Sequence, residues 1–288
     1  MSYNIVLITV DCLRYDHTPL LRRVMSLRPM ISFTGLYSPG TFTGFSIPSL
    51  LTGDYPPVIL PRKSLPRELR RRGYITASLI TNPLLLTSYG FLYDIRRDFD
   101  IFRYYPESVL SGKPISYKLQ HISGVISRRK IGRSVVAPLL TTAALGLTNL
   151  LGFIINKMPP VLPYEKAPYI LRDALRLLDG IRRPFFLWVH LNDLHQPIFC
   201  CSRNRLLSKK MSLVKAHLGD MVPFAATPYF AYKLHILYRQ ALRELDDVLY
   251  SFIRRATRDG RTIVVVTSDH GETFLEHGTI DHLPVEHV

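Results

Sequence analysis

Four short runs of apolar, mostly β-branched or aromatic residues recur along the chain without the polar alternation of a half-exposed strand. They are residues 4–10, 74–80, 184–191 and 262–268. The last three each follow a segment with the apolar periodicity of a helix, namely residues 64–73, 167–181 and 232–260. Helix followed by buried strand, repeated, predicts an α/β fold in which helices sandwich a mainly parallel central sheet.

Polar residues follow three of these runs where each strand is expected to end. Asp11 comes directly after the first run, His195 comes shortly after the third, and Asp269 and His270 follow the fourth. Ligands of parallel sheets bind outside the carboxyl ends of the strands, so we expect these side chains to meet there. A single Asp after a strand is more often a cap or turn residue, so the prediction depends on all three segments converging. Carboxylates and imidazoles are suitable ligands for Mg²⁺, Mn²⁺, Ca²⁺ or Zn²⁺.

The segment TFTGFSIPSLLTG, residues 41–53, places two threonines before a helix-like apolar run. Either hydroxyl could simply start the helix as an N-cap. A Thr hydroxyl is a poor nucleophile unless a base or a metal helps to remove its proton. The first turn of the helix, at Thr43 and Gly44, would also attract an anionic group. The local pattern alone leaves Thr41 and Thr43 both open.

Six strings occur in the order found in the sulfatase-like branch of the alkaline phosphatase superfamily, which the chain therefore resembles over most of its length. They are NIVLITVDCLRYD, TGFSIPSLLTGDYPP, RELRRRGYITASLITNPLL, PFFLWVHLNDLHQP, LYRQALRELDD and VVVTSDHGETFLEHG. The resemblance implies an alkaline phosphatase-like fold and a hydrolase of sulfate or phosphate esters. The family nucleophile stands nine residues before the Thr of LLTG, which gives Thr43 rather than Thr41.

The resemblance also implies roles for other residues. One divalent metal would be bound by Asp11, Asp269 and His270, with Thr43 between metal and substrate. His195 and His282 resemble the histidines that contact the transferred group or protonate the leaving oxygen. The remaining motif residues are expected to support the site or its loops: Glu272, Glu276, His277, a structural His190, and Asp193 as a supporting residue or helix cap.

This sequence departs from the family pattern at several positions. Formylglycine sulfatases have Cys or Ser, Pro and Arg at the positions where this chain has Thr43, Phe45 and Ile47. A threonine at the first of these positions instead resembles the phosphodiesterase, phosphonate hydrolase and phospho-headgroup transferase branches. Cys12 replaces the second acid of the usual adjacent pair, which weakens a calcium site. The chain ends at LPVEHV, where the family begins another core strand, so we expect the C-terminal subdomain to be absent or truncated.

Residues 104–163 interrupt the alternation of helix and strand, and we interpret them as an insertion or cap in a single domain. Within them, residues 134–156 carry no charge and are long enough to cross a bilayer. The segment also contains Pro138, three threonines, Asn149 and two glycines. A segment buried in the protein and a helical hairpin on the membrane surface are therefore the alternatives to a membrane span.

The net charge of +15 favours anionic partners, although a solvated basic face explains short Lys and Arg clusters equally well. No nucleic-acid-binding motif accompanies them, so we expect no specific nucleic acid. Three cysteines, two of them adjacent, are poor material for disulfides, and no export signal is visible. We expect a cytoplasmic protein, with residues 134–156 as its contact to any membrane.

Three functions remain open from the sequence. The first is a metal-dependent hydrolase of a small sulfate or phosphate ester. The second is a transferase of a phospho-headgroup, in which a hydroxyl compound replaces water. The third, from another class, is a non-catalytic protein that binds anions or membranes on the same fold.

Overall fold

The computed structural model describes residues 2–56, 63–82, 94–105, 165–196, 206–211 and 227–282, together with Val58, Pro61, Leu85, Ile198 and Asn204. The expected insertion at 104–163 lies outside the described residues except for its first two positions, and so does the apolar segment 134–156. Both interpretations therefore stay predictions.

Five parallel strands form the central sheet in the order β3-β2-β4-β1-β5. The strands are β1 (Asn4–Val10), β2 (Ile75–Ile80), β3 (Ile101–Tyr104), β4 (Phe185–Leu191) and β5 (Thr262–Ser268). Four of them coincide with the predicted apolar runs to within one residue. The predicted fold class is confirmed, and β3 is an edge strand that the apolar pattern did not indicate.

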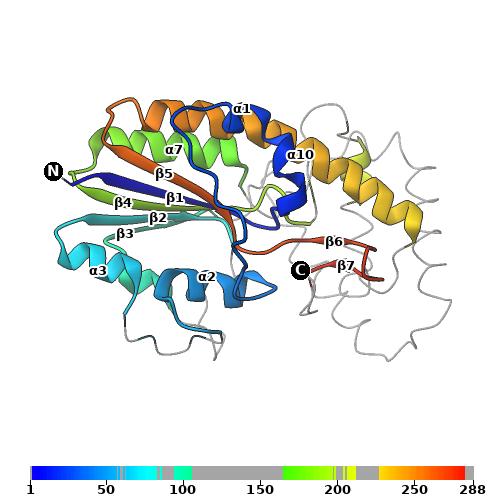
Figure 1. The fold of residues 1–288 in the computed structure, drawn as a ribbon, viewed down its shortest axis with the longest axis horizontal. Helices are drawn as coiled ribbons and strands as arrows, with labels where there is room; N and C mark the ends of the chain where they lie inside the picture. The colour runs from blue at the N-terminus through cyan, green and yellow to red at the C-terminus, as the bar shows by residue number, and fades with distance from the viewer. Residues whose placement is uncertain are drawn as a thin grey trace, which may run out of the picture.

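Helices cover both faces of the sheet (Figure 1). On one face lie α1 (Arg22–Met25), α7 (Ala167–Gly180) and α10 (Pro228–Ala256), and on the other lie α2 (Thr43–Thr52) and α3 (Leu65–Arg71). Among the helices that the structure describes, none combines the length and the apolar character needed to cross a membrane.

Successive residues of β1 contribute to two separate hydrophobic cores. Val6 and Ile8 belong to the core that packs under α7 and α10, whereas Leu7 belongs to the core that contains Ile47 of α2 and Trp188 of β4. Because side chains alternate between the faces of a strand, a strand covered on both sides is mostly apolar on both faces, with few buried polar residues such as Thr9 and His190. This explains why the central strands appear in the sequence as continuous apolar runs.

Short elements extend the carboxyl edge of the sheet. The 3-10 helix η1 (Tyr15–Leu20) follows β1, and the strands β6 (Thr273–Phe274) and β7 (Ile280–Asp281) pair antiparallel after β5 (Figure 1). A further 3-10 helix, η3 (Ile95–Asp98), precedes β3. The chain therefore places the residues after β1 and after β5 beside each other.

Asp193, just beyond β4, connects this edge to the start of α7. Its carboxylate accepts a hydrogen bond from the Ala167 backbone N–H at 3.0 Å and lies 3.0 Å from Lys166 Nζ, with both side chains buried. Of the two roles expected for Asp193, the structure supports the helix cap, supplied from another element. It satisfies an amide that the first turn of α7 leaves unpaired.

Replacing Asp193 with Ala is expected to destabilise the protein by about 3 kcal/mol, because it removes a buried carboxylate that pairs with the Lys166 ammonium and accepts from the Ala167 backbone N–H. Urea denaturation would measure the change. Asp179→Ala is the control, since Asp179 pairs with Arg255 in an exposed ion pair 3.6 Å long and should have little effect. Equal denaturation midpoints for both variants would contradict this role of Asp193.

Candidate active site

The N-terminus of α2 presents Thr43 to the carboxyl edge of the sheet. Phe42, with extended backbone at φ −149°, is the N-cap residue and makes no side-chain cap, and Thr43 is the first residue of the helix. The backbone before the helix passes so close to Phe45 that position 40 requires glycine, because a Cβ there would lie 2.7 Å from Phe45 Cβ. As the first residue of the helix, Thr43 is not its cap. Because Thr43 is only 2% exposed, its hydroxyl does not contact bulk solvent.

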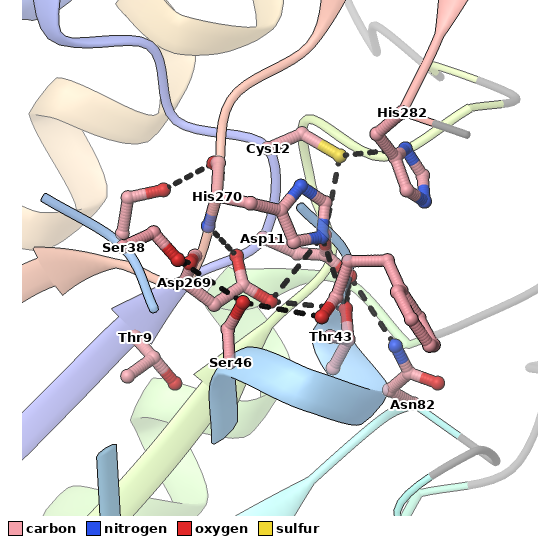
Figure 2. Close-up of polar contacts among 12 residues, drawn as sticks. Thr9, Asp11, Cys12, Ser38, Thr43, Ser46, Asn82, Asp269, His270 and His282 are labelled. Atoms are coloured by element: carbon pink, nitrogen blue, oxygen red, sulfur yellow. Dashed lines mark hydrogen bonds and ion pairs between the residues drawn. The ribbon is translucent and has the colours of Figure 1, made fainter. Parts of the chain in front are cut away.

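Three groups from distant segments surround the Thr43 hydroxyl (Figure 2). Thr43 Oγ1 donates to Asp269 Oδ2 at 2.9 Å, lies 3.2 Å from His270 Nε2, and lies 3.4 Å from Asp11 Oδ2. His270 Nδ1 is 2.8 Å from the Gly271 carbonyl oxygen. A carbonyl only accepts, so Nδ1 carries the proton of the neutral ring and Nε2 presents its lone pair to the hydroxyl.

Asp11 is fully buried at the end of β1 and is held by two asparagine amides. Its Oδ2 accepts from Asn192 Nδ2 at 2.9 Å and from Asn82 Nδ2 at 3.3 Å. Thr81 Oγ1 donates to Asn192 Oδ1 at 2.7 Å and so fixes the orientation of that amide. The sequence reasoning missed both asparagines, although each follows a strand, because it considered only titratable side chains at these positions.

The two carboxylates beside Thr43 have opposite pKa shifts. Burial alone would raise the pKa of Asp11, but the neighbouring His195, His190 and His270 hold it well below its ordinary value. Burial, reinforced by the charge of Asp11, raises the pKa of Asp269. Two carboxylates buried this close repel each other, and a cation between them would relieve both.

The donor atoms suit a divalent cation. One ligand atom each from Asp11, Asp269 and His270 lie within 4.8 Å of one another, and all three residues are buried. Two carboxylate oxygens, one imidazole nitrogen and the adjacent Thr43 hydroxyl make a set that divalent metals accept. The residues predicted as ligands therefore fit a metal, and they are brought together from β1, α2 and the segment after β5.

His195 and His282 lie beside this group. Their ring centroids are 5.0 Å apart, and the ring of His282 is 4.4 Å from that of His270. His195 Nδ1 is 2.6 Å from the Gln196 carbonyl oxygen, and His282 Nδ1 is 3.3 Å from Glu272 Oε2. The two predicted acid candidates are therefore neighbours at one side of Thr43, and both are partly exposed.

The sulfatase family model matches residues 3–284 of the chain. The chain belongs to the sulfatase family. A comparison with curated proteins gave no significant match. The family assignment therefore rests on the model match, which covers nearly the whole sequence.

Solved structures similar to this sulfatase-family chain include the C-terminal periplasmic domain of EcEptC from Escherichia coli, as a complex with Zn. It is 16% identical with a TM-score of 0.61, and the match covers 98% of this chain and 68% of that one. Phosphonate monoester hydrolase of Agrobacterium radiobacter is 16% identical with a TM-score of 0.60, over 96% of this chain and 64% of that one.

The putative sulfatase yidJ from Bacteroides fragilis is also 16% identical, with a TM-score of 0.55 over 97% of this chain and 66% of that one. At these identities the similarity shows the fold alone. It confirms the expected alkaline phosphatase-like architecture, and the chain spans about two thirds of the length of these structures.

Two places in this sulfatase-family protein hold residues that were expected to support the site: the end of β4, with His190, and the loop after β6, with Glu276 and His277. His190 is buried in β4 as predicted, yet its Nε2 lies 3.6 Å from Asp11 Oδ2, so it forms part of the floor of the site. Glu276 accepts from Arg14 Nη1 and from the Phe274 backbone N–H, both at 2.5 Å, and His277 is exposed. These contacts of Glu276 agree with its expected role in shaping the loop.

Proposed function

We propose that this protein is a metal-dependent hydrolase of sulfate or phosphate esters with Thr43 as its nucleophile. The observation that carries the proposal is the position of Thr43 Oγ1, 2.9 Å from Asp269 Oδ2 and 3.2 Å from His270 Nε2. A buried hydroxyl at a helix N-terminus, next to two carboxylates and an imidazole nitrogen, has the surroundings that activate an alcohol.

The residues that would hold the metal are Asp11, Asp269 and His270, with Thr43 beside them. When bound, a divalent cation supplies positive charge that favours loss of the hydroxyl proton and neutralises the oxygens of the ester. The donor set admits Mn²⁺, Mg²⁺, Ca²⁺ and Zn²⁺. The similar EcEptC structure is a complex with Zn, which favours including zinc in any test.

Thr43 Oγ1 would attack the sulfur or phosphorus atom and form a covalent ester to it. The bond from that atom to the leaving oxygen breaks, and His282 or His195 gives this oxygen its proton. Water then attacks the same atom and gives a proton to the histidine that protonated the leaving oxygen, the Thr43 ester bond breaks, and Thr43 Oγ1 regains from solvent the proton it released in the first step. The first turn of α2, at Thr43 and Gly44, favours the anionic group throughout.

The proposal is tested with aryl sulfate, phosphate monoester, phosphodiester and phosphonate substrates, each assayed with Mn²⁺, Mg²⁺, Ca²⁺ and Zn²⁺. We expect turnover of at least one ester class that disappears when a chelator removes the metal. A phospho-headgroup transferase would instead transfer the group to an added alcohol in preference to water. If no substrate is turned over and the purified protein binds none of the four metals, the hydrolase proposal is wrong and an anion-binding role takes its place.

A further inference from the structure

The backbone turn after β1 directs a cysteine toward the candidate metal site. Cys12 has φ +63°, a conformation that residues other than glycine rarely adopt. Tyr238 Oη of α10 donates to the Cys12 carbonyl oxygen at 2.8 Å and helps to hold this turn. In the resulting position Cys12 Sγ lies 3.1 Å from Asp11 Oδ1, whereas the two asparagine amides donate to the other oxygen, Oδ2.

Cys12 also belongs to a second group of donor atoms, with His270 and His282. One ligand atom from each of these three residues lies within 4.8 Å of the others (Figure 2). This group shares His270 with the group of Asp11 and Asp269. Since His270 Nδ1 contacts the Gly271 carbonyl, Nε2 is the nitrogen left for a metal, and a cation bound to Nε2 is one that both groups could share.

A buried carboxylate beside Cys12 gives independent support for a cation at this place. Glu272 is 2% exposed, its Oε2 lies 3.3 Å from His282 Nδ1, and its Oε1 has no hydrogen-bond partner within the part of the chain that the structure describes. An unpaired buried carboxylate oxygen is costly unless positive charge lies near it. A buried free cysteine is often only a small apolar side chain. This thiol, however, lies 3.1 Å from Asp11 Oδ1 and 3.6 Å from His282 Nδ1, the nitrogen that Glu272 Oε2 also contacts.

We propose that the Cys12 thiol is a further ligand of the cation held by Asp11, Asp269 and His270, which makes the site select Zn²⁺ over Mg²⁺ and Ca²⁺. The inference rests on the proposed function, because it requires the same cation. Sulfur is a soft ligand that suits zinc and cobalt, whereas magnesium and calcium prefer oxygen. On binding, the thiol releases its proton to solvent and the sulfur is bound as thiolate.

The test is the absorption spectrum of the protein loaded with Co²⁺. Cobalt bound to a thiolate gives a charge-transfer band in the near ultraviolet that oxygen and nitrogen ligands do not give. We expect this band in the wild type and its loss in both Cys12→Ser and Cys12→Ala. A variant with Cys200→Ser and Cys201→Ser, which keeps Cys12, should retain the band. A far-ultraviolet circular dichroism spectrum of each variant at position 12 shows whether the variant is folded. Loss of the band in a folded variant then reports loss of the ligand rather than loss of the fold.

A second measurement is the binding affinity of each metal. Cys12→Ser should weaken Zn²⁺ binding at least about tenfold and change Mg²⁺ binding much less. Stoichiometric Co²⁺ binding without the band would overturn the Cys12 inference and leave the proposed function standing. A wild type that binds Mg²⁺, Mn²⁺ or Ca²⁺ but neither Co²⁺ nor Zn²⁺ would overturn the Cys12 inference alone, and a wild type that binds no divalent metal would overturn both.

Discussion

Replacing Thr43 with Ala is expected to lower kcat by at least about 1,000-fold, since loss of a nucleophile typically costs several orders of magnitude. The variant removes the only atom proposed to form the covalent bond to sulfur or phosphorus, and it leaves α2 in place because Phe42, not Thr43, is the N-cap residue. Alanine is a good helix former at such a position. Steady-state kinetics on the best substrate from the ester panel would measure the effect.

Thr41→Ala is the matched control. Thr41 is the other hydroxyl of the same segment, lies two residues before α2 and is partly exposed. Its substitution should change kcat less than about threefold, as expected for a residue outside the site. Thr43→Ser, which retains a hydroxyl, should keep measurable activity. Unchanged turnover in Thr43→Ala would remove Thr43 from the mechanism.

The second large effect is expected for Asp269→Asn, which should reduce metal affinity by more than about 100-fold. Loss of a residue that merely supports a ligand typically costs 10- to 100-fold, and Asp269 is proposed as a ligand itself. The metal-free fold should not suffer, because Asn removes the repulsion between the buried carboxylates of Asp269 and Asp11. Metal analysis of the purified protein and its thermal unfolding, with and without metal, would measure both.

Asp247→Asn serves as the control for this variant. Asp247 pairs with Arg23 at 2.7 Å on the surface, and more than half of each side chain is exposed. Its metal content should equal that of the wild type. If Asp269→Asn still binds one equivalent of metal with unchanged affinity, Asp269 is not a ligand.

Strands could be predicted where their apolar runs were long and unbroken. β4 is the central strand and β1 lies beside it, and their continuous, buried apolar sequences mark them clearly. β5 is an edge strand and is only partly buried, but its seven residues include an unbroken run of Ile and Val that marks it as well. β3 has only four residues, Ile101–Tyr104, at the edge of the sheet and is only partly buried. Its sequence, IFRY, is interrupted by Arg103 and is too short for periodicity to distinguish it from a loop.

The site was predictable where charge marked it. Asp11, Asp269 and His270 followed strands and are titratable, so the sequence pointed to them. Asn82 and Asn192 also follow strands, but neutral amides at strand ends are common, and only their distances to Asp11 Oδ2 indicate their role.

The choice between Thr41 and Thr43 shows what local patterns cannot decide. Both hydroxyls fit a helix start, and a shift of two residues along the chain determines which one faces Asp269. That shift is set by the position of α2 against the sheet, where Ile47 and Leu51 are buried in the core with Trp188. The family resemblance selected Thr43 because it carries this tertiary information in the spacing to LLTG.

The central claim is that Thr43 and three residues from distant segments share one cation. The most direct test is a crystal structure of the protein with Zn²⁺ or Mn²⁺, with diffraction data collected at the absorption edge of the metal. We predict one anomalous peak within about 2.0–2.6 Å of ligand atoms of Asp11, Asp269 and His270, with Thr43 Oγ1 directly beside it. A peak elsewhere in the protein, or one with Thr43 Oγ1 turned away from it, would contradict the account.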